Sequence, residues 1–395
     1  LEMRGFPLRG WEILFITMGI FAKSATLPFH TWLPDAGVAP TPVTALLHAA
    51  VLVKIGVYAF ARLFNFTFAI PMDWQFTLLV LGLVSAVVAA CAALVETNIK
   101  RILAYSTVSQ IGYIFMGLAT FNTIGYAGAI LFILMHGIAK AGLFLCAGVI
   151  EHGTGTKDIS RMGGLFLKMP ITALAFLLCV LSVVGLPPFG GFYSKGMVIA
   201  GIIDSGHTAI ASIAVILAIL TAAYLLRVFA LVFTGGPRDS SIHAHREGTG
   251  FMVFVVGLLG VLALGSGLAY GWPMKLVDVA MAQTEGNPAI HILEEAAKLM
   301  PHIDVTSPIA IPVLAPLVAG LLAFLTPAGF RKLRAALALF VTAAALFYAV
   351  RIFNIPGEVP GALIAYPSLE LNLELGAPAD ARLTLVLLAV AQMVF

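Results

Sequence analysis

The sequence predicts an all-α polytopic membrane protein with about ten transmembrane helices, two of them broken. Three observations support this: an apolar composition, recurrent stretches of spanning length, and proline-containing interruptions in two of them. The chain of 395 residues is 61% hydrophobic and 10% charged, and its mean hydropathy is +1.03. Soluble domains carry about 25% charged residues, so this composition indicates a membrane protein. The formal net charge of +3 is small and dispersed, which gives no indication of nucleic-acid binding.

Apolar stretches long enough to cross a bilayer, which takes about 20 residues, recur along the chain. They lie near 10–27, 42–63, 75–95, 102–120, 125–150, 170–203, 209–234, 250–270, 309–327 and 335–353. The opening residues read as a loop, and the closing run 383–395 is too short to span. We therefore expect the chain to be a fragment of a longer polypeptide.

Two of these stretches are interrupted. The stretch 170–203 is too long for one straight helix, and the sequence GLPPFGG at 185–191 predicts a break four residues before Lys195. The first stretch carries Lys23 and then two prolines. Backbone freed by a break is tolerated at membrane depth only where it is buried in protein or lines a hydrated cavity. Broken helices that occur twice are typical of transporters with repeated halves.

Basic residues predict the orientation in the membrane. The connections 64–74, 121–124 and 204–208 contain no lysine or arginine, whereas those after the third, fifth and seventh spans are basic. The positive-inside rule places the basic connections in the cytoplasm. Their basic residues are Lys100, Arg101, Lys157, Arg161, Lys168, Arg238 and Arg246.

Six cationic or titratable side chains within apolar stretches are the candidate functional residues: Lys23, His48, Lys54, His136, Lys140 and Lys195. A charged side chain at mid-bilayer costs roughly 2.5–3.5 kcal/mol on insertion scales. Leucine or methionine would fill the same space, so a row of such groups predicts a path for protons or ions. The alternatives are a lysine that snorkels to the interface and a hydrogen-bonded core histidine.

These groups have the chemistry that proton transfer needs. His136 and Lys140 are four residues apart and share one helix face. Removal from water disfavours the charged form of a lysine. Two charges about 8 Å apart at an effective dielectric near 20 interact by roughly 2 kcal/mol, so protonation of one site alters the next.

Two long blocks of sequence, 21–36 and 39–54, are highly distinctive. They closely resemble the antiporter-like subunits of respiratory complex I (L, M and N type), the large subunits of Mrp cation/proton antiporters, and membrane-bound hydrogenases. Further matches are 100–113, 136–140 and 185–195. The resemblance covers about residues 10–270, which correspond to the second half of one such module.

The resemblance implies a bundle of about fourteen helices with two inverted five-helix repeats and broken helices at the lysines. Lys23 and Lys195 match the family's lysines at the two breaks, and Lys54 matches its central-axis lysine. The family's earlier helices, including one with a glutamate that pairs with the lysine matching Lys23, are absent from this sequence. Residues 308–395 read either as the start of a second module or as a carboxy-terminal extension of transmembrane helices. Residues 271–307 read as an amphipathic linker or a lateral surface helix.

Two functions follow from the resemblance. The first is a proton-translocating membrane subunit of a complex I-like redox-driven pump, in which Lys23 exchanges protons with His48, Lys54 and Lys140, and Lys195 connects to the opposite face. The alternative is a subunit of an Mrp-type Na⁺/H⁺ antiporter driven by the ion gradient. A purely structural scaffold would instead tolerate methionine at the buried lysines.

The sequence predicts no cofactor or metal, because it lacks P-loop, GxGxxG, triad and CxxC patterns. Without a redox centre of its own, the chain would be part of an enzyme only through its assembly. The expected partners are other membrane subunits, neighbouring antiporter-like subunits among them, together with lipid and without nucleic acid. The expected location is the cytoplasmic membrane of a prokaryote, with the basic loops facing the cytoplasm.

Overall fold

The computed structural model describes residues 6–236, 238–239, 247–269, 271–285, 362–366 and 371–374. The chain divides into two units, Leu1–Ala296 and Ala297–Phe395. In the second unit the described residues form one antiparallel pair, β3 (Ala362–Tyr366) and β4 (Leu371–Glu374), with a shift of register between Ala362 and Ile364. The predicted spans 309–327 and 335–353, like residues 286–307 of the predicted amphipathic segment, lie outside the described residues.

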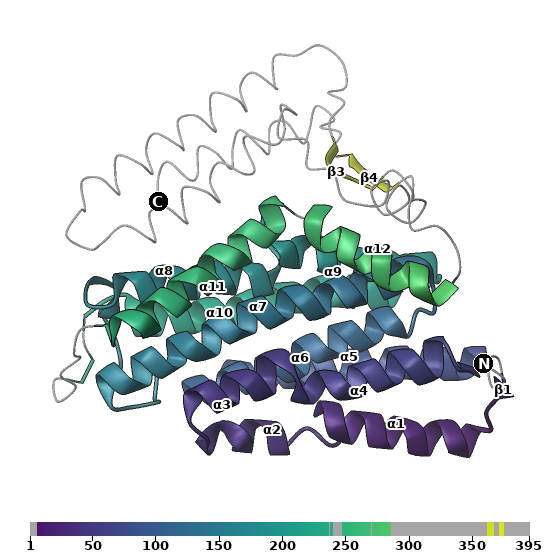
Figure 1. Ribbon diagram of the computed structural model, residues 1–395, viewed down its shortest axis with the longest axis horizontal. Coiled ribbons are helices and arrows are strands. Elements are labelled where there is room, and N and C mark those ends of the chain that lie inside the picture. The colour runs from purple at the N-terminus through teal and green to yellow at the C-terminus, as the bar shows by residue number, and fades with distance from the viewer. Residues whose placement is uncertain are drawn as a thin grey trace, which may run out of the picture. The chain divides into compact units, whose positions relative to one another are not determined.

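The first unit is a helical bundle, which confirms the predicted all-α membrane class (Figure 1). Five of its helical stretches are long and apolar enough to cross a membrane: Thr41–Asn65, Met72–Val95, Thr123–Thr154, Thr208–Phe233 and Gly250–Leu268. A short parallel pair, β1 (Phe6–Pro7) with β2 (Phe68–Ala69), was not predicted. The α-helices are α1 (Gly10–Ser24), α2 (Trp32–Asp35), α3 (Thr41–Ala45), α4 (Leu52–Phe60), α5 (Met72–Val95), α6 (Ile99–Leu118), α7 (Thr123–Thr154), α8 (Pro170–Val184), α9 (Gly190–Asp204), α10 (Thr208–Phe233), α11 (Gly250–Leu268) and α12 (Gly271–Glu285).

Both predicted breaks are confirmed. Helix α1 ends at Ser24 because Ala25 takes a left-handed conformation with φ 53°. Helix α8 ends in the same way at Gly185, with φ 88°, and the chain resumes as α9 at Gly190. A left-handed residue after the last turn is a common helix end, and glycine adopts it without steric cost. The break in α8–α9 thus follows directly from the sequence at 185–191.

The span predicted near 42–63 is less regular than the sequence indicates. It runs as α3, a π-helical turn η2 (Leu46–Ala50), α4 and a second π-helical turn η3 (Ala61–Asn65). The irregularity centres on Val51, whose φ of −122° and ψ of −61° lie outside the helical region. Single π-turns are rare within helices, and those that do occur often lie at functional sites. His48 lies in η2, and Lys54 lies in the first turn of α4.

Helix α6 lies at the centre of the unit and is buried along almost its whole length. Its first turn is capped by Asn98, whose side chain accepts hydrogen bonds from the Lys100 and Arg101 amides. It packs very closely on α5, since a Cβ on Gly112 would lie 2.6 Å from the Gly82 carbonyl oxygen. The other face of α6 lies against α7, which carries His136 and Lys140.

Candidate functional site

Three lysines in the interior of the bundle are bound by main-chain carbonyl groups. Lys54 Nζ donates to the Ile133 oxygen at 2.8 Å, and Lys140 Nζ donates to the Leu103 oxygen at 3.1 Å. Lys195 Nζ lies 2.8 Å and 3.2 Å from the oxygens of Val183 and Val184. No carboxylate within 4.0 Å pairs with any of these ammonium groups among the described residues.

The break between α8 and α9 explains how Lys195 is held. The last carbonyls of a helix have no partner within it, and they carry the negative end of its dipole. Because α8 ends at Val184, its terminal carbonyls face the lysine of the following helix. The ammonium also lies 4.8 Å from the ring centre of Tyr113 and 5.8 Å from that of Phe132, within the range of a cation–π interaction. Lys195 is only 3% exposed, so these groups replace its water.

Two buried histidines lie between the lysines. His48 is 0% and His136 is 1% exposed, and none of their ring nitrogens has a hydrogen-bond partner among the described protein atoms. The His48 ring stacks on Phe144 with 4.4 Å between ring centres. Buried polar groups are nearly always paired with protein or with ordered water, so these unpartnered ring nitrogens are unusual positions in the interior.

Electrostatic contacts join these residues into one cluster. His136 lies within the electrostatic range of His48, Lys54, Lys140 and Lys195. His48 is also coupled to Lys140, and Lys140 to Lys195. We call His48, Lys54, His136, Lys140 and Lys195 the amine cluster. The structure therefore brings together five of the six side chains that the sequence predicted.

Lys23 is the exception, because within the described residues it lies outside the amine cluster. It is exposed, on α1 at the edge of the first unit. Helix α1 packs on α4 through its opposite face, which buries Ile13, Ile20 and Ser24. Sequence hydropathy does not distinguish the two faces of this helix, because apolar residues cover both.

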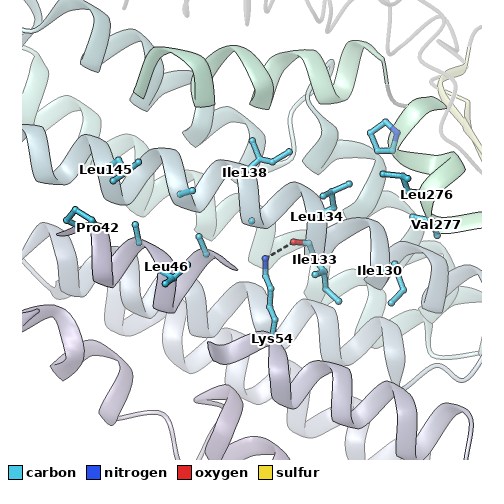
Figure 2. Close-up of a pocket in the computed structure, with 15 residues that line it drawn as sticks. Pro42, Leu46, Lys54, Ile130, Ile133, Leu134, Ile138, Leu145, Leu276 and Val277 are labelled. Carbon is cyan, nitrogen blue, oxygen red and sulfur yellow. Dashed lines mark hydrogen bonds between the residues drawn. The ribbon is translucent and has the colours of Figure 1, made fainter. Parts of the chain in front are cut away.

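Lys54 lies at the floor of an apolar groove of about 810 Å³, shown in Figure 2. Its side chain points from α4 toward Ile133 on α7. The groove runs between α3, η2, α7 and α12. Its other lining residues are Pro42, Ala45, Leu46, Ala49, Ile130, Ile133, Leu134, Gly137, Ile138, Ala141, Leu145, Pro273, Leu276 and Val277.

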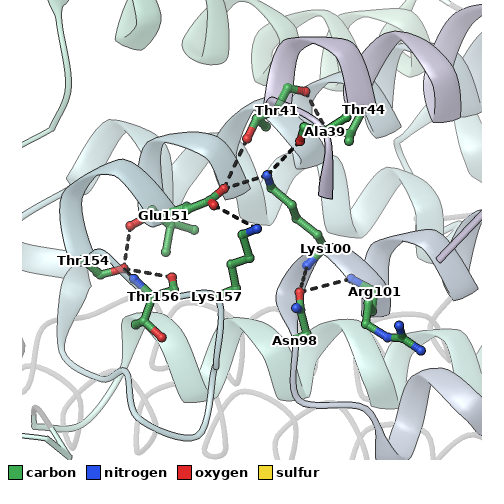
Figure 3. A network of polar contacts seen from close by, with 11 residues as sticks. Ala39, Thr41, Thr44, Asn98, Lys100, Arg101, Glu151, Thr154, Thr156 and Lys157 are labelled. Atoms are coloured by element: carbon green, nitrogen blue, oxygen red, sulfur yellow. Dashed lines mark hydrogen bonds and ion pairs between the residues drawn. The ribbon is translucent and has the colours of Figure 1, made fainter. Parts of the chain in front are cut away.

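A second group of charges, which the sequence did not single out, lies at the carboxyl end of α7 (Figure 3). Glu151 pairs with Lys100 at 2.7 Å and with Lys157 at 3.3 Å. Glu151 follows Lys140 by eleven residues, about three helical turns, and so lies on the same face of α7. That spacing is the signal through which it could have been found.

Glu96 forms an ion pair at the end of α5. Its carboxylate lies 2.9 Å from Arg101, which also binds Asp35 at 2.8 Å. Partial burial raises the pKa of Glu96, but hydrogen bonds from the Asn98 and Thr97 amides and the Arg101 guanidinium outweigh it, so the pKa lies below its ordinary value.

The polar residues of α6 take part in bonding between helices. Tyr224 on α10 donates to Ser106 at 2.9 Å, and Gln110 reaches Thr221 and Tyr224 at 3.4 Å each. Tyr113 donates its hydroxyl hydrogen to the Ala214 carbonyl. In the described part of the chain no three histidine, cysteine, aspartate or glutamate side chains come together as a metal site.

Comparisons with solved structures show the same fold. The chain is similar to the Mrp complex from Dietzia sp. DQ12-45-1b with a TM-score of 0.65 and 27% identity, over 69% of this chain and 59% of the other. It is also similar to the membrane-bound sulfane sulfur reductase, an archaeal respiratory membrane complex, with a TM-score of 0.60 and 26% identity. That match covers 65% of this chain and 44% of the other.

Sequence relatives come from two kinds of complex. The chain is 34% identical over 295 residues to Na⁺/H⁺ antiporter subunit A1 of Staphylococcus haemolyticus, covering 68% of this chain and 36% of the relative. It is 40% identical over 237 residues to NADH-quinone oxidoreductase subunit L of Buchnera aphidicola, covering 60% and 38%. The chain thus spans little more than a third of the length of these relatives.

The family described as NADH:quinone oxidoreductase/Mrp antiporter, transmembrane, matches residues 2–221, which are more than half of the chain. The matched segment contains the two broken helices and all five residues of the amine cluster. The chain therefore belongs to the NADH:quinone oxidoreductase/Mrp antiporter transmembrane family.

Proposed function

We propose that this chain is a proton-translocating membrane subunit of a complex I-like redox-driven pump and that protons move through the amine cluster. The observation that carries the proposal is the type of partner each lysine has. A carboxylate beside a buried lysine would hold its proton firmly by charge, whereas a carbonyl dipole stabilises the ammonium less. The three lysines bound to carbonyls can therefore lose and regain a proton.

The spacing of the cluster supports transfer between its members. Each positive charge in a medium of low dielectric constant disfavours the next, so a proton that arrives at one amine favours release from its neighbour. His136 is coupled to the other four groups, which makes it the central member of the path. Lys195, at the break in α8–α9, is the terminal group toward the opposite face in this scheme.

The proposal includes an orientation and partners. The basic connections that contain Lys100, Lys157 and Arg161 face the cytoplasm of a prokaryotic cell. Related chains are subunits of multi-subunit membrane complexes, and the partners of this chain are other membrane subunits, including antiporter-like ones.

The second candidate is a subunit of an Mrp-type Na⁺/H⁺ antiporter. The similarity to Na⁺/H⁺ antiporter subunit A1 and to a solved Mrp complex favours it. Sodium prefers oxygen ligands, and among the described residues no carboxylate is fully buried. On this second reading too, the amine cluster carries the protons, and a sodium site lies elsewhere in the assembly.

The test uses the complete native assembly in closed membrane vesicles with a fluorescent pH indicator. Lys140→Met should abolish acidification, and Lys275→Met, at an exposed position on α12, should leave it unchanged. Normal acidification with Met at position 140 would refute the assignment. Energising the same vesicles with an electron donor or with a sodium gradient separates the two candidates, and mass spectrometry of the copurified subunits identifies the partners.

A further inference from the structure

A cavity of about 470 Å³ with several charged lining groups lies at the basic end of α7, apart from the amine cluster. Its charged and titratable lining groups are Lys100 from α6, Glu151 and His152 from α7, and Lys157 from the following loop. The segment 38–42 contributes the Thr41 hydroxyl, and α11 contributes only the uncharged Met252. The cavity thus has a single carboxylate facing two ammonium groups and one imidazole.

Glu151 is the centre of this cavity (Figure 3). One of its oxygens binds Lys100 at 2.7 Å and the Thr41 hydroxyl at 3.4 Å, and the other binds Lys157 at 3.3 Å. The Lys100 side chain is 3% exposed, whereas that of Glu151 is 28% exposed. The Glu151 side chain is therefore partly exposed to the aqueous phase and also contacts a buried side chain of the interior.

Two rows of side chains lead from Glu151 toward the amine cluster. On α7, Glu151 is followed inward by Gly148, Phe144 and Lys140, which recur every three or four residues and share one face. On α3 and η2 the second row is Thr41, Thr44 and His48. The rows lie together, because Thr41 contacts Glu151 at one end and His48 stacks on Phe144 at the other.

The second row offers polar atoms along this route. The fully buried Thr44 hydroxyl donates to the Thr41 carbonyl at 2.9 Å. Beyond it, both ring nitrogens of the fully buried His48 lack a protein partner, and His48 is coupled to Lys140. Gly148 allows the rows to approach, since a Cβ there would lie 2.6 Å from the Thr41 methyl carbon.

We propose that Glu151 is the proton-uptake group of the face that carries the basic loops and that it supplies the amine cluster through Thr41, Thr44 and His48. The inference rests on the proposed function. The carboxylate binds one proton from the aqueous phase and becomes neutral. It then releases that proton along Thr41 and Thr44 to a ring nitrogen of His48, and His48 passes it to the neutral amine of Lys140. Glu151 is ionised again and returns to its ion pair with Lys100 and Lys157.

The experiment measures proton transport by the whole assembly in closed vesicles, with the pH set separately on each face. Glu151→Gln should slow transport at least about tenfold and remove the dependence of the rate on pH at the basic-loop face. The dependence on pH at the opposite face should remain. Glu151→Asp should restore most of the rate, because it returns a carboxylate.

The matched control is Glu96→Gln, which removes another carboxylate from the same end of the bundle. Glu96 pairs with Arg101 and does not line the cavity, so its rate should stay at the wild-type level. Equal losses in the two glutamine variants would overturn the proposal, since they would indicate a general effect of charge or assembly.

Lys140→Met separates the inference from the function on which it rests. Loss of transport in that variant, together with full transport in Glu151→Gln, would overturn the uptake role and leave the proposed function intact. Full transport in both would overturn both. If Glu151→Gln does not assemble, Thr44→Val tests the same route at nearly constant volume. A slower rate with Val supports the route, and an unchanged rate contradicts it.

Discussion

The Lys54 ammonium lies 2.8 Å from the carbonyl oxygen of Ile133, although the two residues are 79 positions apart in the sequence. The contact joins the first turn of α4 to the amino-terminal half of α7, at the edge of the apolar groove (Figure 2). A lysine held in this way does not extend to the membrane surface. The contact directs Lys54 toward α7 and favours an interior position over snorkelling, which the sequence alone had left open.

Replacement of Lys54 by methionine should abolish proton transport and leave assembly intact. Methionine fills a similar volume, and the loss of one hydrogen bond costs only about 1 kcal/mol, whereas the titratable amine disappears. Ile55→Met, at the next and exposed position, serves as the control. Vesicle acidification and the yield of purified assembly measure the two effects, and retention of full transport by K54M would contradict the role of Lys54.

Two substitutions at Tyr113 should separate its ring from its hydroxyl. Both Phe and Leu remove the hydrogen bond to the Ala214 carbonyl, but only Leu removes the ring that lies under Lys195. Since a cation–π interaction contributes about 0.5–2 kcal/mol, Y113L should reduce transport more than Y113F. The comparison is made on transport rates normalised to the amount of assembly. Equal rates in the two variants would show that the ring does not hold the ammonium.

Alanine at Gly191 should destabilise the broken helix. A Cβ at this position would lie 1.8 Å from the Ser182 carbonyl oxygen, so α8 and α9 would have to separate. Overpacking of this kind typically costs about 1–3 kcal/mol. Gly265→Ala is the control, because its Cβ would meet no atom within 4 Å. Thermal unfolding in detergent compares the two, and a G191A midpoint equal to that of G265A would be inconsistent with this contact.

The ion pair of Glu96 should make the basic end of the bundle sensitive to acid. Its folded pKa lies below the ordinary value of 4.5, so its contribution to stability is present above that pH and is lost as the pH falls through the folded pKa. Because Glu96 is partly exposed, the contribution is small, on the order of 0–1 kcal/mol.

Glu96→Gln should therefore flatten the acid limb of the stability profile and have a smaller effect at neutral pH. The measurement is the unfolding midpoint between pH 3 and pH 7, in the variant and in the wild-type protein. An unaltered acid limb in E96Q would mean that the ion pair with Arg101 does not contribute.

Much of this fold could be predicted from the sequence because membrane spans need long apolar runs. The stretch GLPPFGG predicted the break between α8 and α9. Lys23 and the proline that follows it, Pro28, predicted the break after α1. The π-turn that contains His48 could not be predicted, because its residues read as an ordinary apolar helix. The turn lies against α7, a neighbour that local sequence does not reveal.

The residues of the candidate site also divide into those that could be predicted from the sequence and those that could not. Charge within apolar runs identified His48, Lys54, His136, Lys140 and Lys195 from the sequence. Lys23 satisfied the same criterion but lies on the outer face of α1, because burial depends on neighbouring helices and not on local hydropathy. Glu151 was missed because it lies in the last turns of α7 beside the lysines of the connections, where an ion pair is ordinary.

The carbonyl groups that accept from Lys54, Lys140 and Lys195 affect how members of this family are compared. Leu103, Ile133, Val183 and Val184 provide their peptide oxygens, and every amino acid possesses such an oxygen. Substitution of these residues would leave the carbonyl dipoles that face the ammonium groups in place. A comparison of side chains would show only a change of one aliphatic residue for another. The electrostatic environment of the amines therefore depends on the course of the main chain. A search for partner side chains would not detect it.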